Sequence, residues 1–172
     1  MNFHKGLMML LLAAVFAMPA FAQEEAKAEN WLEKRFGKEL VNAKGEKVAT
    51  ATLKGKTVGI YFSAHWCHWC RKFTPQVVAF RDAVAKQNFE IVFVSFDKDK
   101  DAMDGYMKEM KMGWLAIPFD AAQRTAVAKE FDVHGIPTLI ILDKDGKKIT
   151  DKGLDDVRAK GNEALKGWTT KK

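Results

Sequence analysis

Cysteine is scarce in this sequence, which has only two among its 172 residues, Cys67 and Cys70. This composition suits a redox carrier, because such a protein must avoid misfolding through thiols of its own. A disulfide between the two would close a loop with two intervening residues, so its stabilising effect lies at the low end of the usual ~2–4 kcal/mol. Residues three apart at a helix start are nevertheless close enough to form and break such a bond. We therefore interpret the pair as a redox centre and not as a structural cross-link.

Long hydrophobic runs are missing as well, with the exception of residues 7–17. That run is shorter than the ~20 residues that a membrane-spanning helix needs. It follows a basic residue and precedes a small-x-small pattern that ends at Ala22, as in secretory signal peptides. We therefore expect a signal peptide at residues 1–22 and a periplasmic protein, with an uncleaved signal that anchors the chain as the alternative. No cysteine follows the run, so a lipoprotein anchor has no attachment point.

The sequence also lacks basic motifs interleaved with aromatic residues, which are typical of nucleic-acid binding. Its net charge of +6 comes from 28 Lys and Arg against 22 Asp and Glu spread along the chain. A solvated surface explains this charge better than nucleic-acid binding does, and the charge would favour acidic partner proteins. No internal repeat or low-complexity segment is present. We expect a flexible polar leader at residues 23–30 and one domain at residues 31–172.

Apolar runs alternate with segments of helical periodicity over this domain. An expected N-terminal hairpin has its turn at residues 42–45, and a second hairpin has its turn at residues 143–146. The sequence predicts an α/β fold, with a central mixed sheet flanked by helices on both faces. The expected strands are residues 40–41, 48–53, 57–63, 90–96, 138–142 and 147–150, and the expected helices are residues 30–36, 101–111, 121–131, 154–165 and the segment after Cys70.

Residues 60–75, IYFSAHWCHWCRKFTP, resemble the active-site segment of the thioredoxin superfamily. Within it they resemble the tryparedoxin and nucleoredoxin branch. Three further stretches agree in the same order, namely VSFD at 94–97, WLAIPF at 114–119 and FDVHGIPTLI at 131–140. The resemblance implies a thioredoxin fold and a thiol-disulfide oxidoreductase that acts on protein or peptide disulfides. The dithiol would itself carry the electrons, with no separate cofactor.

The resemblance also implies roles for individual residues. Cys67 would be the exposed nucleophile, because a helix N-terminus favours a thiolate there, and Cys70 would resolve the mixed disulfide. Pro137 would be a cis-proline packed against the pair, although a cis bond is found in only ~5–6% of X-Pro cases. Ile136 would then offer its backbone to a substrate strand. Pro75 would kink the active-site helix, which is a structural role.

Metal binding is a chemical alternative for the same segment. His65, Cys67, His68 and Cys70 are suitable ligand types, and the fold would then serve as a copper-binding or metallochaperone module. However, four donors within six residues are hard to arrange tetrahedrally around one ion. Haem attachment is excluded, because Arg71 stands where the CxxCH motif needs histidine.

The dipeptide between the cysteines departs from the family pattern, in which tryparedoxins have Pro-Pro. Here His68 could lower the pKa of Cys67, and a stabilised reduced form would make the protein a better oxidant. Alternatively, the His68 ring is exposed and has little influence on the Cys67 thiol. Trp69 either receives a peptide on its apolar surface or covers the helix start.

A second departure concerns the proton acceptor for Cys70. Thioredoxin has a buried aspartate six residues before the first cysteine, and Tyr61 occupies that position here. Asp97 could lie near the site, although capping of the following turn is the preferred interpretation. Trp66 and Trp114 would lie beside the disulfide and add a docking surface, with core packing as an equal alternative for Trp114. His134 either reaches the rim of the site or has no role.

These observations predict a monomeric thiol-disulfide oxidoreductase that works as a reductase on protein substrates. The alternatives are a disulfide oxidant or isomerase and the copper-binding module. Because a periplasm is oxidising, either direction would require a membrane-bound redox partner to restore the pair.

Overall fold

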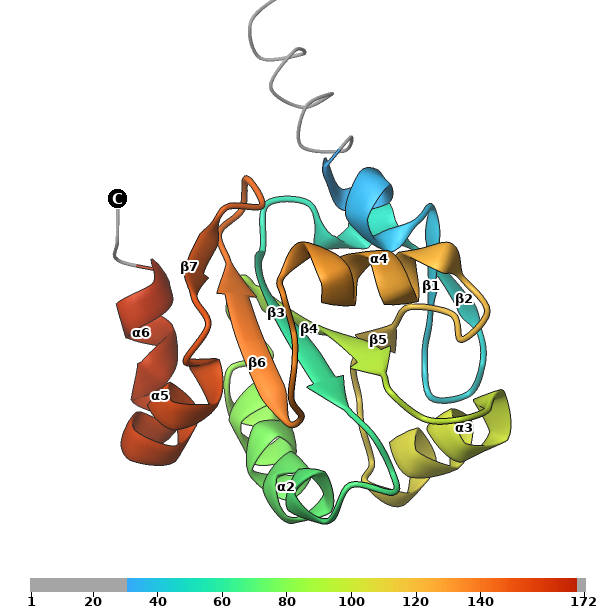
Figure 1. Cartoon of the computed structure of the whole chain (residues 1–172). Helices are drawn as coiled ribbons and strands as arrows, with labels where there is room; N and C mark the ends of the chain where they lie inside the picture. The colour runs from blue at the N-terminus through green and yellow to red at the C-terminus, as the bar shows by residue number, and fades with distance from the viewer. Residues whose placement is uncertain (1–30, 170–172) are drawn as a thin grey trace, which may run out of the picture.

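A seven-stranded mixed sheet forms the centre of the protein (Figure 1). The computed structural model describes residues 31–169. The strands stand in the order β2-β1-β5-β4-β3-β6-β7. β3 is parallel to β4, and β4 to β5, whereas the β1–β2, β1–β5, β3–β6 and β6–β7 pairs are antiparallel. The strands are β1 Glu39–Val41, β2 Lys47–Ala49, β3 Thr57–Ser63, β4 Phe89–Ser95, β5 Leu115–Ala116, β6 Thr138–Leu142 and β7 Lys148–Thr150.

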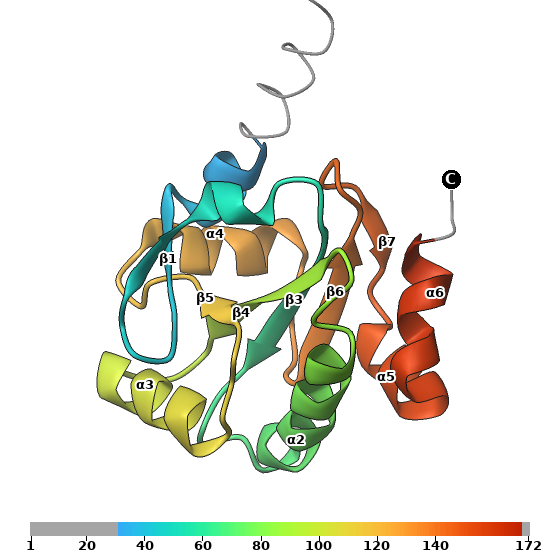
Figure 2. The ribbon, with the colours of Figure 1, turned by 180° about the vertical axis from the view of Figure 1, so that it is seen from behind.

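Helices cover both faces of this sheet. α2, α3, α5 and α6 pack on one face, while α4 and the helical residues 31–36 pack on the other (Figures 1 and 2). Two short 3-10 helices, η1 and η2, complete the fold. The bounds are η1 Thr50–Leu53, α2 His68–Ala83, α3 Lys100–Glu109, α4 Ala122–Glu130, α5 Gly153–Lys160, η2 Gly161–Glu163 and α6 Ala164–Thr169.

The two faces of the sheet carry separate halves of the core. All seven residues of β3 are buried, as expected for a central strand that is covered on both sides. Because side chains alternate along a strand, Tyr61 points to the face of α2 and α3. Its neighbours Ile60 and Phe62 point to the face of α4. The continuous apolar run of β3 is therefore needed to fill both halves.

The thioredoxin-type α/β fold and its N-terminal hairpin are confirmed, and β1 pairs antiparallel with β2. The strand expected at residues 48–53 is wrong beyond Ala49, where the chain turns into η1 and buries Thr50 and Leu53. The helix expected at residues 154–165 is interrupted at Gly161, whose φ of 53° lies outside the helical region. Within residues 31–169, none of the helices has the length and hydrophobicity required to span a membrane.

Candidate redox site

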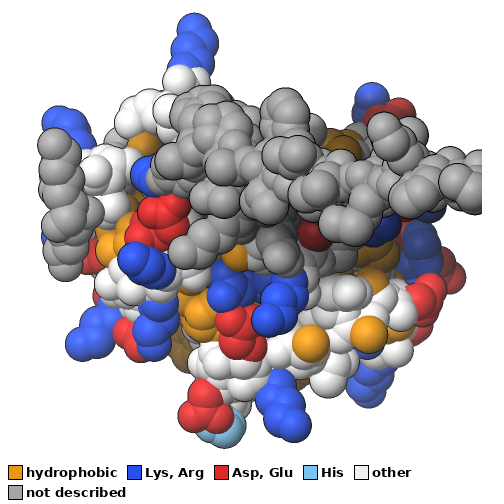
Figure 3. Space-filling view, turned by 90° about the horizontal axis from the view of Figure 1, so that it is seen from above, with side chains coloured by type: hydrophobic (Ala, Val, Ile, Leu, Met, Phe, Trp, Pro, Cys, Tyr) orange, Lys and Arg blue, Asp and Glu red, His pale blue; other side chains and the backbone are white. Residues whose placement is uncertain are grey.

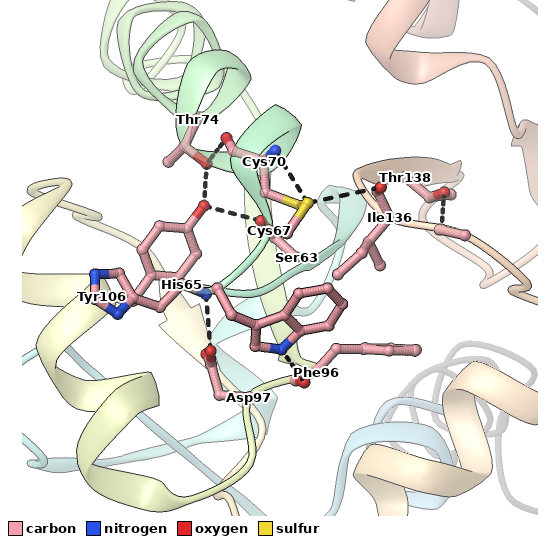
Figure 4. Close-up of a disulfide and its surroundings, with 12 residues drawn as sticks. Ser63, His65, Cys67, Cys70, Thr74, Phe96, Asp97, Tyr106, Ile136 and Thr138 are labelled. Atoms are coloured by element: carbon pink, nitrogen blue, oxygen red, sulfur yellow. Dashed lines mark hydrogen bonds between the residues drawn. A yellow bond between two sulfur atoms is a disulfide. The ribbon is translucent and has the colours of Figure 1, made fainter.

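A disulfide joins Cys67 to Cys70 where the chain leaves β3 and enters α2 (Figure 4). Cys67 is the N-cap residue of α2, and its sulfur accepts a hydrogen bond from the backbone N–H of Cys70 at 3.1 Å. Cys67 retains 7% of its surface, whereas Cys70 has none. An incoming thiolate can therefore reach only the Cys67 sulfur. The helix dipole and this N–H stabilise negative charge at the same atom.

The loop before β6 faces the exposed sulfur. The peptide bond between Ile136 and Pro137 is cis, as the family resemblance implies. The carbonyl oxygen of Ile136 lies 3.8 Å from the Cys67 sulfur, a contact and not a hydrogen bond while the disulfide carries no proton. Both cysteines pack with Ala64, Phe96 and Ile136 in a small cluster. The loop thus brings a backbone acceptor to the atom at which exchange would occur.

Two exposed tryptophans flank the disulfide. The exposed fractions of Trp66 and Trp69 are 61% and 68%, and these are the large exposed hydrophobic residues of the described chain. Trp66 is fixed by a hydrogen bond from its Nε1–H to the carbonyl oxygen of Phe96 at 3.0 Å. Large exposed apolar side chains are typical of contact surfaces. Both residues are therefore available to a bound peptide.

Trp114 lies elsewhere, in the core. It is 1% exposed, packs edge-on against Tyr61 with ring centroids 6.0 Å apart, and belongs to the half of the core on the α2 face. The expected docking role is therefore wrong for Trp114, because a buried ring cannot contact a substrate, and the alternative of core packing describes it.

A groove of about 430 Å³ runs along the exposed sulfur. We call it the disulfide groove. His134 reaches its rim, which the sequence left as an alternative, and its ring is 2.8 Å from the carboxylate of Asp132. The residues that line the groove come from the start of α2, from the loop after β4 and from the cis-proline loop: Trp66, Cys67, His68, Trp69, Phe96, His134, Gly135 and Ile136.

His68 is exposed and packs edge-on against Trp69, with ring centroids 5.5 Å apart. No hydrogen bond from its ring fixes it within the described part of the chain. Its effect on the pKa of Cys67 thus stays a prediction. His65 points away from the sulfurs, because its Nε2 lies 2.8 Å from Glu109, the last residue of α3. Over residues 31–169, no group of three or more His, Cys, Asp or Glu side chains is arranged to hold a metal ion.

Asp97 supports the loop that precedes the disulfide. Its carboxylate accepts hydrogen bonds from the backbone N–H of His65 at 2.7 Å and from the hydroxyl of Ser95 at 2.8 Å. Burial raises the pKa of Asp97, an effect that these two hydrogen bonds oppose. The expected cap of the following turn is wrong, because Asp99 caps α3 by accepting from the N–H of Ala102. Asp97 instead joins the end of β4 to the segment that leads into α2.

A network of hydroxyl groups lies beneath Cys70. Thr74 donates to the carbonyl oxygen of Cys70 at 2.9 Å, so its two lone pairs are left for the hydroxyls of Tyr61 at 2.8 Å and Tyr106 at 2.6 Å. Since the Tyr106 proton is then committed, Ser63 must donate to Tyr106, at 2.9 Å. Burial raises the pKa of Tyr61 and of Tyr106, so both phenols remain protonated.

The sequence identifies Tyr61 as a substitution for aspartate, but it does not predict the other three members of this network, Thr74, Tyr106 and Ser63. Thr74 could have been found, because it lies four residues after Cys70 on the same side of the helix. Tyr106 and Ser63 are separated by 43 residues, and their contact depends on how α3 packs against β3. A single sequence contains no local signal for such a contact.

Comparisons with known proteins agree with this geometry. A family model described as thioredoxin-like matches residues 55–148. "Probable nucleoredoxin 1" of Arabidopsis thaliana is 42% identical over 127 residues, which cover 73% of this chain and 22% of that protein. Nucleoredoxin of Bos taurus is 41% identical over 121 residues, 69% of this chain and 27% of the relative. The chain thus spans about a quarter of the length of these two curated relatives.

Solved structures of tryparedoxins match over nearly their full length. Native tryparedoxin I from Crithidia fasciculata is 37% identical with a TM-score of 0.69, over 76% of this chain and 92% of that chain. Tryparedoxin II complexed with glutathionylspermidine is 34% identical with a TM-score of 0.71, over 77% of this chain and 94% of that chain.

The relatives also correct the expected location. The signal peptide predicted at residues 1–22 and the leader at residues 23–30 lie outside the described residues. The periplasmic location inferred from them is wrong, because the relatives are nucleoredoxins, which are cytoplasmic or nuclear proteins. The inference relied on a short N-terminal pattern of a basic residue, an apolar run and small residues, whereas the relatives match this chain over 111 to 127 residues.

Proposed function

This chain belongs to the thioredoxin-like family, in the branch of the nucleoredoxins and tryparedoxins, which are thiol-disulfide oxidoreductases, and from this we propose that it exchanges disulfides with protein or peptide substrates through Cys67 and Cys70. One observation carries the proposal. The Cys67–Cys70 disulfide sits at the start of α2 with only its outer sulfur exposed, facing the carbonyl oxygen of Ile136.

The exchange has two steps in the reducing direction. The Cys67 thiolate attacks one sulfur of the substrate disulfide, and the other substrate sulfur leaves as a thiolate that takes up a proton. Cys70 then loses its proton and attacks the Cys67 sulfur, which releases the second substrate thiol. The substrate gains two electrons and two protons, and the Cys67–Cys70 disulfide closes. No further cofactor is needed for this cycle.

Substrate positioning is assigned to the disulfide groove. An extended peptide beside Ile136 can pair with the backbone of the cis-proline loop, while Trp66 and Trp69 cover its apolar side chains. The related tryparedoxin II has been solved in complex with glutathionylspermidine. A small peptide disulfide is thus a reasonable first substrate for this chain as well.

We propose that electrons flow from the protein to the substrate, so that it acts as a reductase. The alternative, a disulfide oxidant or isomerase, depends on His68, which could stabilise the Cys67 thiolate. Equilibration with glutathione distinguishes them, since ~−270 mV is typical of thioredoxin and ~−120 mV of a strong oxidant. His68→Pro should lower the potential if the ring stabilises the thiolate. An unchanged potential would show that His68 has no such effect.

A redox partner that restores the dithiol, and a monomeric state, belong to the same proposal. The expectation that this partner is membrane-bound depended on the periplasmic location. Because that location is wrong, the proposal does not include a membrane-bound partner.

The proposal is tested by insulin reduction with the purified chain. We expect turnover with wild type and none with Cys67→Ser. Cys70→Ser should instead accumulate a mixed disulfide with the substrate, visible by non-reducing electrophoresis. Copper analysis runs in parallel, and stoichiometric copper without turnover would contradict the proposal in favour of a metal-binding module.

A further inference from the structure

A second hollow, of about 500 Å³, adjoins the disulfide groove. It lies between the first turns of α2 and the end of α3. Trp66 and His68 line both hollows, so these two side chains form the wall between them. The hollow is lined by Trp66, His68, Arg71, Lys72 and Met110, and we call it the basic hollow.

The charges of the basic hollow do not balance. Over residues 31–169, no acidic side chain pairs with Lys72, whose ammonium lies 5.2 Å from the ring centroid of Trp69. Arg71 contacts Glu109 through Nη2 alone, at 3.1 Å, and its side chain is 50% exposed. The same carboxylate faces His65 through its other oxygen. One acidic group is therefore shared, while Lys72 and the remaining guanidinium N–H groups are free to bind an anion.

The far end of the molecule differs in this respect. On the coloured part of the face in Figure 3, which is seen from above and lies away from the disulfide, basic and acidic side chains are intermixed. The hollow beside Cys67 thus combines an uncompensated cation with direct continuity to the groove in which we place the substrate.

We propose that the basic hollow binds an acidic side chain of the substrate peptide, within a few residues of the cysteine that Cys67 attacks. This inference rests on the proposed function and names its substrate class. A peptide that leaves the disulfide groove over His68 enters the basic hollow directly. There a carboxylate can accept from the guanidinium of Arg71 and approach the ammonium of Lys72. A lysine at the same peptide position would meet like charges.

The test uses three peptides, each with one intramolecular disulfide. They are identical except for Asp, Asn or Lys at the residues next to the attacked cysteine. Pre-reduced protein is mixed with each peptide, and the second-order rate constant of the single turnover is measured. Partly exposed charge pairs predict rates that fall from Asp to Asn to Lys, by about threefold to tenfold overall.

Three substitutions locate the effect. Lys72→Gln should lower the Asp-to-Asn rate ratio toward one, with the remaining preference due to Arg71, whereas Glu109→Gln should raise the ratio, because it removes the competing carboxylate. Lys147→Gln is the matched control, since it removes the same charge from an exposed position in the turn after β6, at the opposite end of the protein (Figure 1).

The outcomes separate the two proposals. Equal rates for the three peptides, with an active protein, would overturn the acidic-substrate inference and leave disulfide exchange intact. If Lys147→Gln lowered the Asp-to-Asn rate ratio as much as Lys72→Gln does, the preference for an acidic residue would not arise in the basic hollow, and the inference would be overturned. Failure to reduce any of the peptides would overturn the proposed function and this inference together.

Discussion

The hydroxyl of Thr74 connects more partners than any other side chain near the disulfide. It donates to the backbone of α2 at Cys70 and accepts from Tyr61 in β3 and from Tyr106 in α3. All of these groups are buried, so no water can replace a missing partner without entering the core. One oxygen atom therefore links the helix that carries the disulfide to a strand and to a second helix.

Thr74→Val tests this link, since valine has nearly the same shape and no hydroxyl. We expect a loss of about 1–3 kcal/mol in the free energy of unfolding, because Tyr61 and Tyr106 lose their common acceptor. Urea denaturation measures the change. Thr125→Val, at an exposed position in α4, is the control and should stay within about 0.5 kcal/mol of wild type. Equal effects of the two substitutions would contradict the importance of the network.

Asp97 makes the stability depend on pH. Its pKa is raised in the folded chain above the ordinary value of 3.8, so the folded state holds the proton more tightly than the unfolded chain does. The resulting stabilisation is complete below the unfolded pKa and is lost as pH rises through the folded pKa.

Asp97→Asn removes this titration. The advantage of wild type over the variant in free energy of unfolding should therefore be larger at about pH 4 than at about pH 7. Asparagine accepts fewer hydrogen bonds than a carboxylate does. This loss changes the free energy of unfolding of the variant by the same amount at both pH values, so it does not alter the dependence on pH. Asp151→Asn, at an exposed position, is the control. A difference that is constant over this pH range would disprove the role of Asp97.

At the scale of elements, the helical residues 31–36 are held against the far end of the sheet. Trp31 donates from Nε1 to the carbonyl oxygen of Lys144, and Arg35 donates to that of Gly146 and pairs with Glu130 at the end of α4. The guanidinium also lies 5.2 Å from the ring centroids of both Trp31 and Phe131. The turn between β6 and β7 therefore has to come very close to this helix.

Gly146→Ala should break that close approach. The φ of 79° at this residue disfavours any side chain, and a Cβ would lie 2.6 Å from the Trp31 ring. Gly45→Ala is a matched control, with a φ of 78° and open space around it. We expect Gly45→Ala to cost about 1–2 kcal/mol for the backbone alone, and Gly146→Ala at least about 1 kcal/mol more. Equal losses in urea denaturation would refute the steric contact.

The elements that sequence predicts best are those whose signal is local. The apolar run of β3 and the turn around Gly45 follow from residues that are adjacent in the chain. The switch from β2 to η1 after Ala49 is not local, because it depends on the burial of Thr50 and Leu53 under the rest of the fold. Trp114 shows the same limit, because the local sequence pattern does not indicate how deeply its side chain is buried.

For the candidate site the division is similar. The cysteines and the cis-proline follow a family pattern, which places them together without a structure. The link from Asp97 to His65 and the contact between Tyr106 and Thr74 both cross 32 positions of sequence. They arise only when β4 and α3 have packed against β3 and α2.

At the scale of the whole molecule, the large exposed hydrophobic side chains of residues 31–169 lie at the disulfide. Trp66 and Trp69 are too few to support a stable dimer, which needs ~800 Å² on each partner. We therefore expect a single species of monomer mass by sedimentation velocity, unchanged in Trp66→Ala with Trp69→Ala. A concentration-dependent dimer that this double variant abolishes would contradict the expected monomer.

The burial of Cys70 has a consequence for timing. Its sulfur has no exposed surface, so a substrate held covalently on Cys67 can be released from within the protein only through that one buried thiol. The dwell time of the covalent complex then depends on how quickly Cys70 loses its proton and reaches Cys67, as well as on how readily the substrate thiolate leaves. The burial of one sulfur in the protein therefore contributes to the lifetime of every covalent complex, whichever substrate is bound.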